Sequence, residues 1–235
     1  MSLLFEELDF QQTPLGELML RRRSSPSLGG RSVYEVKLND EFLMSSVVTR
    51  SEEALATLAL AAQSGRACDV LVGGLGLGYT AAAVLRSERV QRVTVMEYLE
   101  PVLDWHTRRL LPVSDTLLDD PRCELVHGDF FRRIADGETN ADPRHDVILL
   151  DIDHSPESWL HASHELFYSF EGLKRLAASL TPQGVFGLWS AEPSSPAFLE
   201  RLQHAFTRVE QHPVRYDHPM LHREETNIVV IAGQA

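Results

Sequence analysis

The pattern of hydrophobic and polar residues changes once along the 235-residue chain. Up to residue 48, apolar residues fall in short runs that alternate with polar ones, at 15–20, 32–38 and 42–44. Alternation with a period of two predicts strands, and the turn-forming residues between the runs predict hairpin connections. We therefore expect residues 1–48 to form a small antiparallel β domain.

From residue 49 onward, short apolar runs alternate with segments of helical periodicity. We expect strands at 69–72, 92–96, 123–126, 146–150, 185–189, 214–216 and 227–231, and helices at 49–60, 80–85, 101–111, 130–135, 164–180 and 196–206. Thr49 and Glu52 have the spacing of a capping box at the start of the first helix. Apolar strands separated by helices predict a mostly parallel sheet covered on both faces, with the last two strands antiparallel. Residues 49–235 are thus expected to form one Rossmann-like α/β domain.

The charge balance narrows the range of partners. The chain has 34 Asp and Glu against 22 Lys and Arg, for a formal net charge of −12. This argues against binding to nucleic acids, whose phosphates are neutralised by Lys and Arg, and against docking on an anionic membrane. It suits a small cationic substrate, although many soluble proteins are acidic for solubility alone.

The cysteines and the N-terminal residues bear on location. Cys68 and Cys123 lie in apolar, strand-like runs, which predicts free buried thiols in a reducing compartment. The first ten residues include acidic residues and no basic one, unlike a signal peptide. No apolar run approaches the ~20 residues of a membrane span. We expect a cytoplasmic protein.

The strongest local motif is a glycine-rich turn between a predicted strand and a predicted helix. Such glycines let the backbone approach a ligand closely, although turns also need glycine for their own geometry. Glu97 follows Gly78 by 19 residues, at the end of the next strand. An acid at this spacing can accept hydrogen bonds from both hydroxyls of a ribose, and the alternative is a helix-capping role. The candidate nucleoside-binding residues of the turn are Gly73, Gly74, Gly76 and Gly78.

Two further strands end in polar residues. Asp129 follows the strand at 123–126 and can accept from an adenine amino group or cap the next helical turn. Asp151, Asp153 and His154 follow the apolar strand at 146–150, at the sheet edge where ligands bind. We expect these two carboxylates and the imidazole to perturb one another's titration, as acid–base sites require, and the alternative is a capped loop.

The order of these elements resembles the class I S-adenosylmethionine-dependent methyltransferase fold. Within that fold the chain resembles the spermidine synthase family of aminopropyltransferases over nearly its whole length. The likeness rests on the N-terminal sheet and on the stretches Asp119-Asp120-Pro121-Arg122, Gly128-Asp129 and Glu165-Leu166-Phe167-Tyr168. The resemblance implies S-adenosylmethionine or its decarboxylated form as co-substrate, an amine or other small molecule as acceptor, and a homo-oligomer, for which we expect a dimer.

The resemblance also implies residue roles. Asp151 would be the general base that deprotonates an acceptor amine, Glu97 would hold the ribose and Asp129 the adenine. The acceptor would be bound by Asp153, His154, Glu53 and Tyr168.

The chain departs from the family pattern at four positions. The glycine-rich loop of the family carries an Asp that holds the aminopropyl amine, and Gly76 stands there in this chain. The family has a second Asp three residues after the one that matches Asp151, and this chain has His154 there. A Tyr-x-Glu segment of the family is replaced by residues 50–53, and a glutamine in the preceding strand is replaced by Leu43. Loss of a carboxylate beside an ammonium removes a charge-assisted hydrogen bond, about 1.5–3 kcal/mol.

Three functions therefore stay open. The first is aminopropyl transfer to an amine, and the second is methyl transfer from S-adenosylmethionine to a small molecule, which Gly76 favours. The third is a nucleoside-binding homologue without catalysis. His161 and His164 stand three residues apart near Asp151, but the spacing matches no zinc signature, and we expect no metal.

Overall fold

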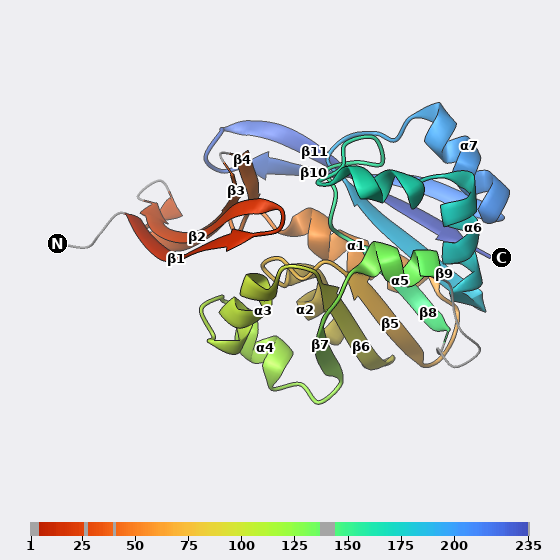
Figure 1. The fold of residues 1–235 in the computed structure, drawn as a ribbon, viewed down its shortest axis with the longest axis horizontal. Helices are drawn as coiled ribbons and strands as arrows, with labels where there is room; N and C mark the ends of the chain where they lie inside the picture. The colour runs from red at the N-terminus through yellow and green to blue at the C-terminus, as the bar shows by residue number, and fades with distance from the viewer. Residues whose placement is uncertain (1–4, 26–27, 40, 137–143, 235) are drawn as a thin grey trace.

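The computed structural model describes residues 5–25, 28–39, 41–136 and 144–234 (Figure 1). An antiparallel sheet of four strands comes first, in the order β1-β2-β3-β4. Its strands are β1 (Phe5–Thr13), β2 (Gly16–Ser25), β3 (Arg31–Leu38) and β4 (Glu41–Ser45). The predicted N-terminal sheet is confirmed. The strand β1 was missed because its sequence, FEELDFQQT, is mostly polar and lies at the sheet edge.

The second sheet has seven strands in the order β10-β11-β9-β8-β5-β6-β7. The strands β5 to β9 pair in parallel, and β11 pairs antiparallel with both β9 and β10, which confirms the expected Rossmann-like fold. The strands are β5 (Cys68–Gly73), β6 (Val90–Glu97), β7 (Cys123–His127), β8 (His145–Leu150), β9 (Leu180–Ser190), β10 (Arg208–His218) and β11 (Arg223–Gly233).

Helices cover both faces of this sheet. One hydrophobic core contains the buried residues of α1, α2 and α3, and the other contains those of α5, α6 and α7. A short α4 packs beside β7 and was not predicted. The helices are α1 (Arg50–Ala62), α2 (Tyr79–Leu85), α3 (Glu100–Thr107), α4 (Ser114–Leu118), α5 (Phe130–Asp136), α6 (Phe170–Ala178) and α7 (Pro196–Ala205), with a 3-10 turn at Ala162–Leu166.

Two local predictions are wrong. Thr49 precedes α1 but its side chain makes no capping hydrogen bond, and its hydroxyl donates to the Glu53 carboxylate. The helix expected at 164–180 is interrupted: the 3-10 turn ends at Leu166 and α6 starts only at Phe170. Ser169 causes the restart, since its hydroxyl caps the new helix by accepting from the Gly172 amide at 3.2 Å.

The N-terminal sheet and the β10–β11 hairpin converge beside the carboxyl ends of the parallel strands (Figure 1). The Trp105 indole on α3 donates to Asp9 on β1 at 2.7 Å, and the Arg23 guanidinium on β2 contacts the Met220 sulfur at the hairpin tip at 3.0 Å. These contacts seat the small sheet over the edge where ligands bind in this fold. Cys68 and Cys123 are free thiols, and no helix among the described residues is long and apolar enough to cross a membrane.

Candidate active site

The glycine-rich turn follows β5 with its backbone in conformations that suit glycine. Gly74 and Gly76 have φ angles of +93° and +48°. A Cβ atom on Gly74 would lie 2.3 Å from the carbonyl oxygen of Asp151, so glycine here lets the turn pack directly against the end of β8. A Cβ atom on Gly76 would lie 2.8 Å from the sulfur of Met44 on β4. The loop is thus enclosed by β8 on one side and by the N-terminal sheet on the other.

Glu97 is buried at the end of β6 and holds this turn in place. Its carboxylate accepts hydrogen bonds from the Leu75 amide at 2.9 Å and the Leu99 amide at 2.8 Å. Burial raises the pKa of this carboxyl, and the backbone amides act in the opposite direction. Because Leu99 precedes α3, Glu97 binds a backbone amide at the start of this helix, as the capping alternative expected. Glu97 also lines a cavity, so it is in a position to face a ligand.

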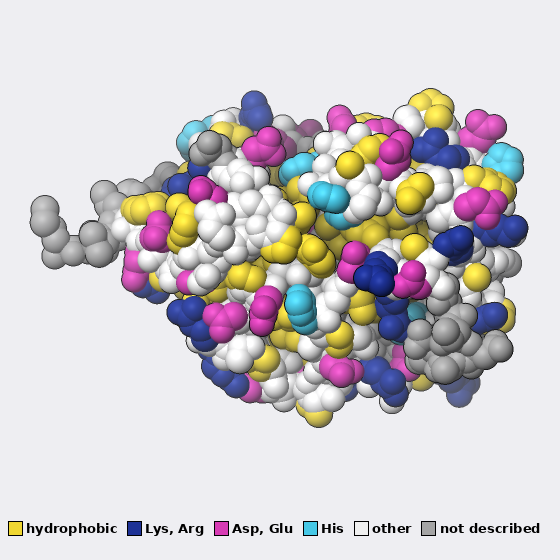
Figure 2. All heavy atoms as spheres, viewed as in Figure 1, with side chains coloured by type: hydrophobic (Ala, Val, Ile, Leu, Met, Phe, Trp, Pro, Cys, Tyr) yellow, Lys and Arg dark blue, Asp and Glu magenta, His cyan; other side chains and the backbone are white. Residues whose placement is uncertain are grey.

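A first cavity of about 280 Å³ opens between the N-terminal sheet and the larger sheet. On the face drawn in Figure 2, hydrophobic side chains gather in a hollow between these two parts, with acidic and histidine side chains at its edges. The lining includes apolar residues of both sheets, the glycine-rich turn and the ends of β6, β7 and β8. The lining residues that bear on function are Met44, Gly74, Gly76, Glu97, Leu99, Asp129, Phe131, Asp151, His161 and His164.

Asp129 has a structural role as well as a place in this lining. Its carboxylate accepts from the Arg132 amide at 3.0 Å in the first turn of α5. The helix-capping alternative is therefore realised, and the residue still faces the first cavity.

A second cavity of about 290 Å³ adjoins the first. The two share five lining residues: Leu43, Met44, Gly76, Asp151 and Ile152. The wall of the second cavity combines β4, the start of α1, the ends of β8 and β9, and the β10–β11 hairpin. Its polar side chains include Glu52, Asp151, His154, Tyr216, His218, Glu225 and Asn227, and no Lys or Arg is among the described residues that line either cavity.

Asp151 lies where the two cavities meet. The Thr80 hydroxyl at the start of α2 donates to its carboxylate at 2.6 Å. Burial raises the pKa of this carboxyl, and the hydrogen bond from Thr80 only partly offsets the effect.

Glu52, which was expected to cap the first helix, lines the second cavity together with Asp151. Burial and the charge of Asp151 raise the pKa of Glu52 to about 7, against the hydrogen bond from the Ser51 hydroxyl at 2.7 Å. Two carboxyl groups in one buried site hinder each other's ionisation. The Asp151 and Glu52 pair is thus a proton-binding centre that faces the second cavity.

Glu53, which was expected to bind the acceptor, points elsewhere. Both of its oxygens bind the Arg86 guanidinium, at 3.0 and 3.2 Å, and this pair lowers the pKa of the carboxyl. Glu53 lines neither of the two cavities.

The carboxylates of Asp151 and Asp153 make separate sets of contacts. Asp153 is among the residues that line the second cavity, but its fully buried carboxylate already has partners: one oxygen binds the Leu160 amide and the His164 ring, and the other accepts from the Tyr168 hydroxyl at 2.8 Å. Burial and the Asp153 charge raise the pKa of Tyr168, which lines neither cavity. His154 does line the second cavity. Asp153 and Tyr168 therefore brace the segment after β8, and their carboxylate and hydroxyl groups already have partners.

Sequence reasoning missed three groups of this site. Glu52 could not be told from its neighbour Glu53 without the rotation of α1. Tyr216 and Glu225 enter from the C-terminal hairpin and carry no motif that marks them. Met44 carries no signal either, yet its sulfur lies against Gly76 of the glycine-rich turn.

Comparison with known proteins agrees with this geometry. The family model of the spermine/spermidine synthase domain matches residues 49–210. A polyamine aminopropyltransferase of Streptomyces coelicolor is 32% identical over 173 residues, which is 72% of this chain and 30% of that relative. A second polyamine aminopropyltransferase, from Pyrobaculum islandicum, is 27% identical over 50% of this chain and 39% of its own length. The chain therefore matches well under half the length of either curated relative.

Solved structures share the fold at low sequence identity. A spermidine synthase in complex with the transition-state analogue AdoDATO superposes with a TM-score of 0.75 at 17% identity, over 97% of this chain and 74% of the other. Human methyltransferase-like protein 13 in complex with SAH superposes with a TM-score of 0.58 at 20% identity, over 79% of this chain and 82% of the other. The two structures establish the shared fold.

Proposed function

The chain belongs to the spermine/spermidine synthase family, and from this premise we propose that it transfers an aminopropyl group from decarboxylated S-adenosylmethionine to an amine. The observation that carries the proposal is the pair of joined cavities. The first cavity is lined by the glycine-rich turn and by Glu97 and Asp129, which suit a nucleoside. The second cavity is lined by acidic side chains, and no Lys or Arg is among its described lining residues.

The first cavity would take the nucleoside. Glu97 would bind the ribose and Asp129 the adenine amino group, with the turn at Gly73, Gly74, Gly76 and Gly78 as the cradle. Support comes from the position of Glu97 and Asp129 in one lining, beside apolar surface that suits a purine ring.

The charges of the lining favour the decarboxylated donor, because no Lys or Arg is among the described residues that line either cavity. S-adenosylmethionine carries a carboxylate on its tail, and near Gly76 that group would meet Asp151 and Glu52 rather than a Lys or Arg. Like charges in a buried site repel each other. The decarboxylated donor ends in an ammonium, which these carboxylates attract.

Asp151 would act as the base of the reaction. The lone pair of the acceptor nitrogen attacks the methylene carbon bound to the sulfonium, so a nitrogen–carbon bond forms and the sulfur–carbon bond breaks. The sulfur keeps the electron pair and leaves as neutral methylthioadenosine, and the proton of the nitrogen passes to Asp151. Burial raises the pKa of this carboxyl, so its carboxylate is a stronger base than an exposed one.

A second candidate, methyl transfer from S-adenosylmethionine, is favoured by one observation. Met44 lies against Gly76, where the family has the Asp that holds the aminopropyl amine. The donor tail loses about 1.5–3 kcal/mol of charge-assisted hydrogen bonding there. We rank this candidate second because its donor would bring a carboxylate to Asp151 and Glu52.

Product analysis separates the two. The protein is incubated with each donor and diaminobutane, and mass spectrometry follows the nucleoside products. Methylthioadenosine together with an aminopropylated amine supports our proposal. S-adenosylhomocysteine supports the second candidate, and a failure to bind either donor in calorimetry would leave the noncatalytic alternative.

The remaining expectations belong to the same proposal. We propose a cytoplasmic homodimer that needs no metal. The edge strand β1 supports association because Phe5 and Phe10 are 47% and 43% exposed on it. Sedimentation analysis tests the dimer, and full activity in EDTA tests the independence from metal.

A further inference from the structure

The β10–β11 hairpin forms the outer wall of the second cavity. The hairpin extends beyond the other strands of the seven-stranded sheet and reaches toward β4 (Figure 1). Tyr216 on β10 lies directly opposite Glu225 on β11 in the antiparallel register. Directly opposed residues point to the same face of a sheet, and so do residues two apart on one strand, such as Glu225 and Asn227. All three line the second cavity.

Tyr216 lines the same cavity as the acidic pair Glu52 and Asp151. Its hydroxyl donates to the Asn227 side chain at 2.7 Å. Burial raises the pKa of Tyr216, and the charges of Glu225 and Glu52 act in the same direction. Glu52 on α1 and Glu225 on β11 line the same cavity, so it has acidic groups on two different elements of its wall.

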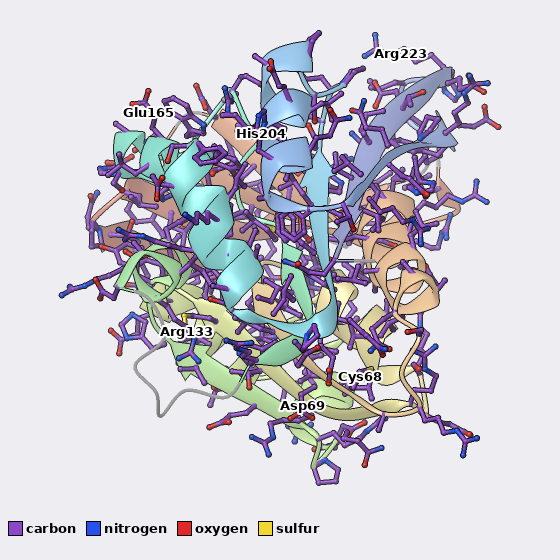
Figure 3. The ribbon with its side chains drawn as sticks, turned by 90° about the vertical axis from the view of Figure 1, so that its right-hand side faces the viewer. Cys68, Asp69, Arg133, Glu165, His204 and Arg223 are labelled. Atoms are coloured by element: carbon purple, nitrogen blue, oxygen red, sulfur yellow. The ribbon has the colours of Figure 1, made fainter. Side chains whose placement is uncertain are left out.

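Glu225 forms an ion pair with Arg223, which does not line the cavity. The Arg223 guanidinium binds the Glu225 carboxylate at 2.7 Å, but 68% of the Arg223 side chain is exposed, compared with 25% of Glu225. Arg223 stands at the hairpin tip, on the outside of the molecule (Figure 3). An exposed ion pair of this kind is weak. A cation that enters the cavity can therefore compete with it for Glu225.

We propose that Glu225 is a specificity-determining residue that binds a second cationic group of the acceptor, distal to the amine that reacts at Asp151. This inference rests on the proposed function. It assigns a role to a hairpin residue that lies in no motif of the sequence, and it predicts that linear diamines are preferred over monoamines of equal length.

The chain offers two matched controls for a Glu225→Gln variant. Glu224→Gln removes the same charge from the neighbouring residue, which is exposed and lines neither cavity. Arg223→Gln removes the competing guanidinium and leaves the cavity wall intact.

Calorimetry with methylthioadenosine present measures acceptor binding without turnover. We expect Glu225→Gln to weaken diaminobutane and diaminopentane about tenfold to a hundredfold, and butylamine and pentylamine less than twofold. Glu224→Gln should change no amine more than twofold, and Arg223→Gln should tighten the diamines a few-fold.

An equal loss for diamines and monoamines in Glu225→Gln, or no loss for either, overturns the inference. So does a wild-type protein that binds no amine. If the wild type binds diamines in a Glu225-dependent way but produces no aminopropylated amine, the proposed function fails and the binding role of Glu225 stands.

Discussion

Replacing Glu52 by Gln should make the protein more stable at alkaline pH while weakening its acceptor site. The folded protein raises the pKa of Glu52 from 4.5 to about 7, because the carboxyl is buried beside Asp151. A group whose folded pKa lies above its unfolded value destabilises the folded state once both states are ionised. At pH 8 the wild type therefore bears the full cost of a buried charge, and at pH 4 it bears almost none.

The size of the effect follows from the shift. A pKa shift of one unit corresponds to about 1.4 kcal/mol, so this shift sets an upper bound of about 3 kcal/mol. The side chain is only partly buried, which leaves about 1–3 kcal/mol as the expected gain for Glu52→Gln at pH 8. For a chain of this size, each kcal/mol raises Tm by roughly 2–4 °C.

Thermal unfolding followed by circular dichroism at pH 4, 6 and 8 measures the difference between the wild type and Glu52→Gln. The adjacent Glu53→Gln is the matched control. Its carboxyl has a lowered pKa through Arg86, so its loss should destabilise the protein at pH 8 by less than about 1 kcal/mol. A Glu52→Gln protein that is no more stable than wild type at pH 8, or whose advantage is the same at pH 4, refutes the reasoning.

Other predictions follow from the same contacts. Asp151→Asn should lower kcat at least about a hundredfold, and unchanged kcat would eliminate it as the base. The acceptor kcat/KM should rise with pH through about 7 as Glu52 ionises, and a profile that is flat from pH 6 to 8 contradicts this. Tyr168→Phe leaves the buried Asp153 carboxylate short of a donor and should cost about 1–3 kcal/mol in denaturant unfolding, whereas wild-type stability would show that this hydrogen bond contributes little. Gly74→Ala would place a methyl group 2.3 Å from the Asp151 carbonyl oxygen and should abolish donor binding in calorimetry, a reading that intact binding would disprove.

Local patterns in the sequence were sufficient for the fold. Strand and helix periods follow from side-chain geometry within a few residues, so the alternation after residue 49 predicted the parallel strands and the antiparallel end. Local reasoning failed at two helix starts. The Thr49 side chain makes no capping hydrogen bond, and the Ser169 cap divided one expected helix in two.

The sequence by itself determined which residues end the parallel strands, and so brought Gly74, Gly76, Glu97 and Asp151 to one edge of the sheet. Only the tertiary structure decided the acceptor side of that edge. Consecutive residues of a helix point about 100° apart, so the choice between Glu52 and Glu53 depends on how α1 is rotated against the sheet. Glu225 follows Glu52 by 173 positions, and the two come to face one cavity because a hairpin folds back over the sheet. Such long-range proximity is set by packing and leaves no periodic trace in the sequence.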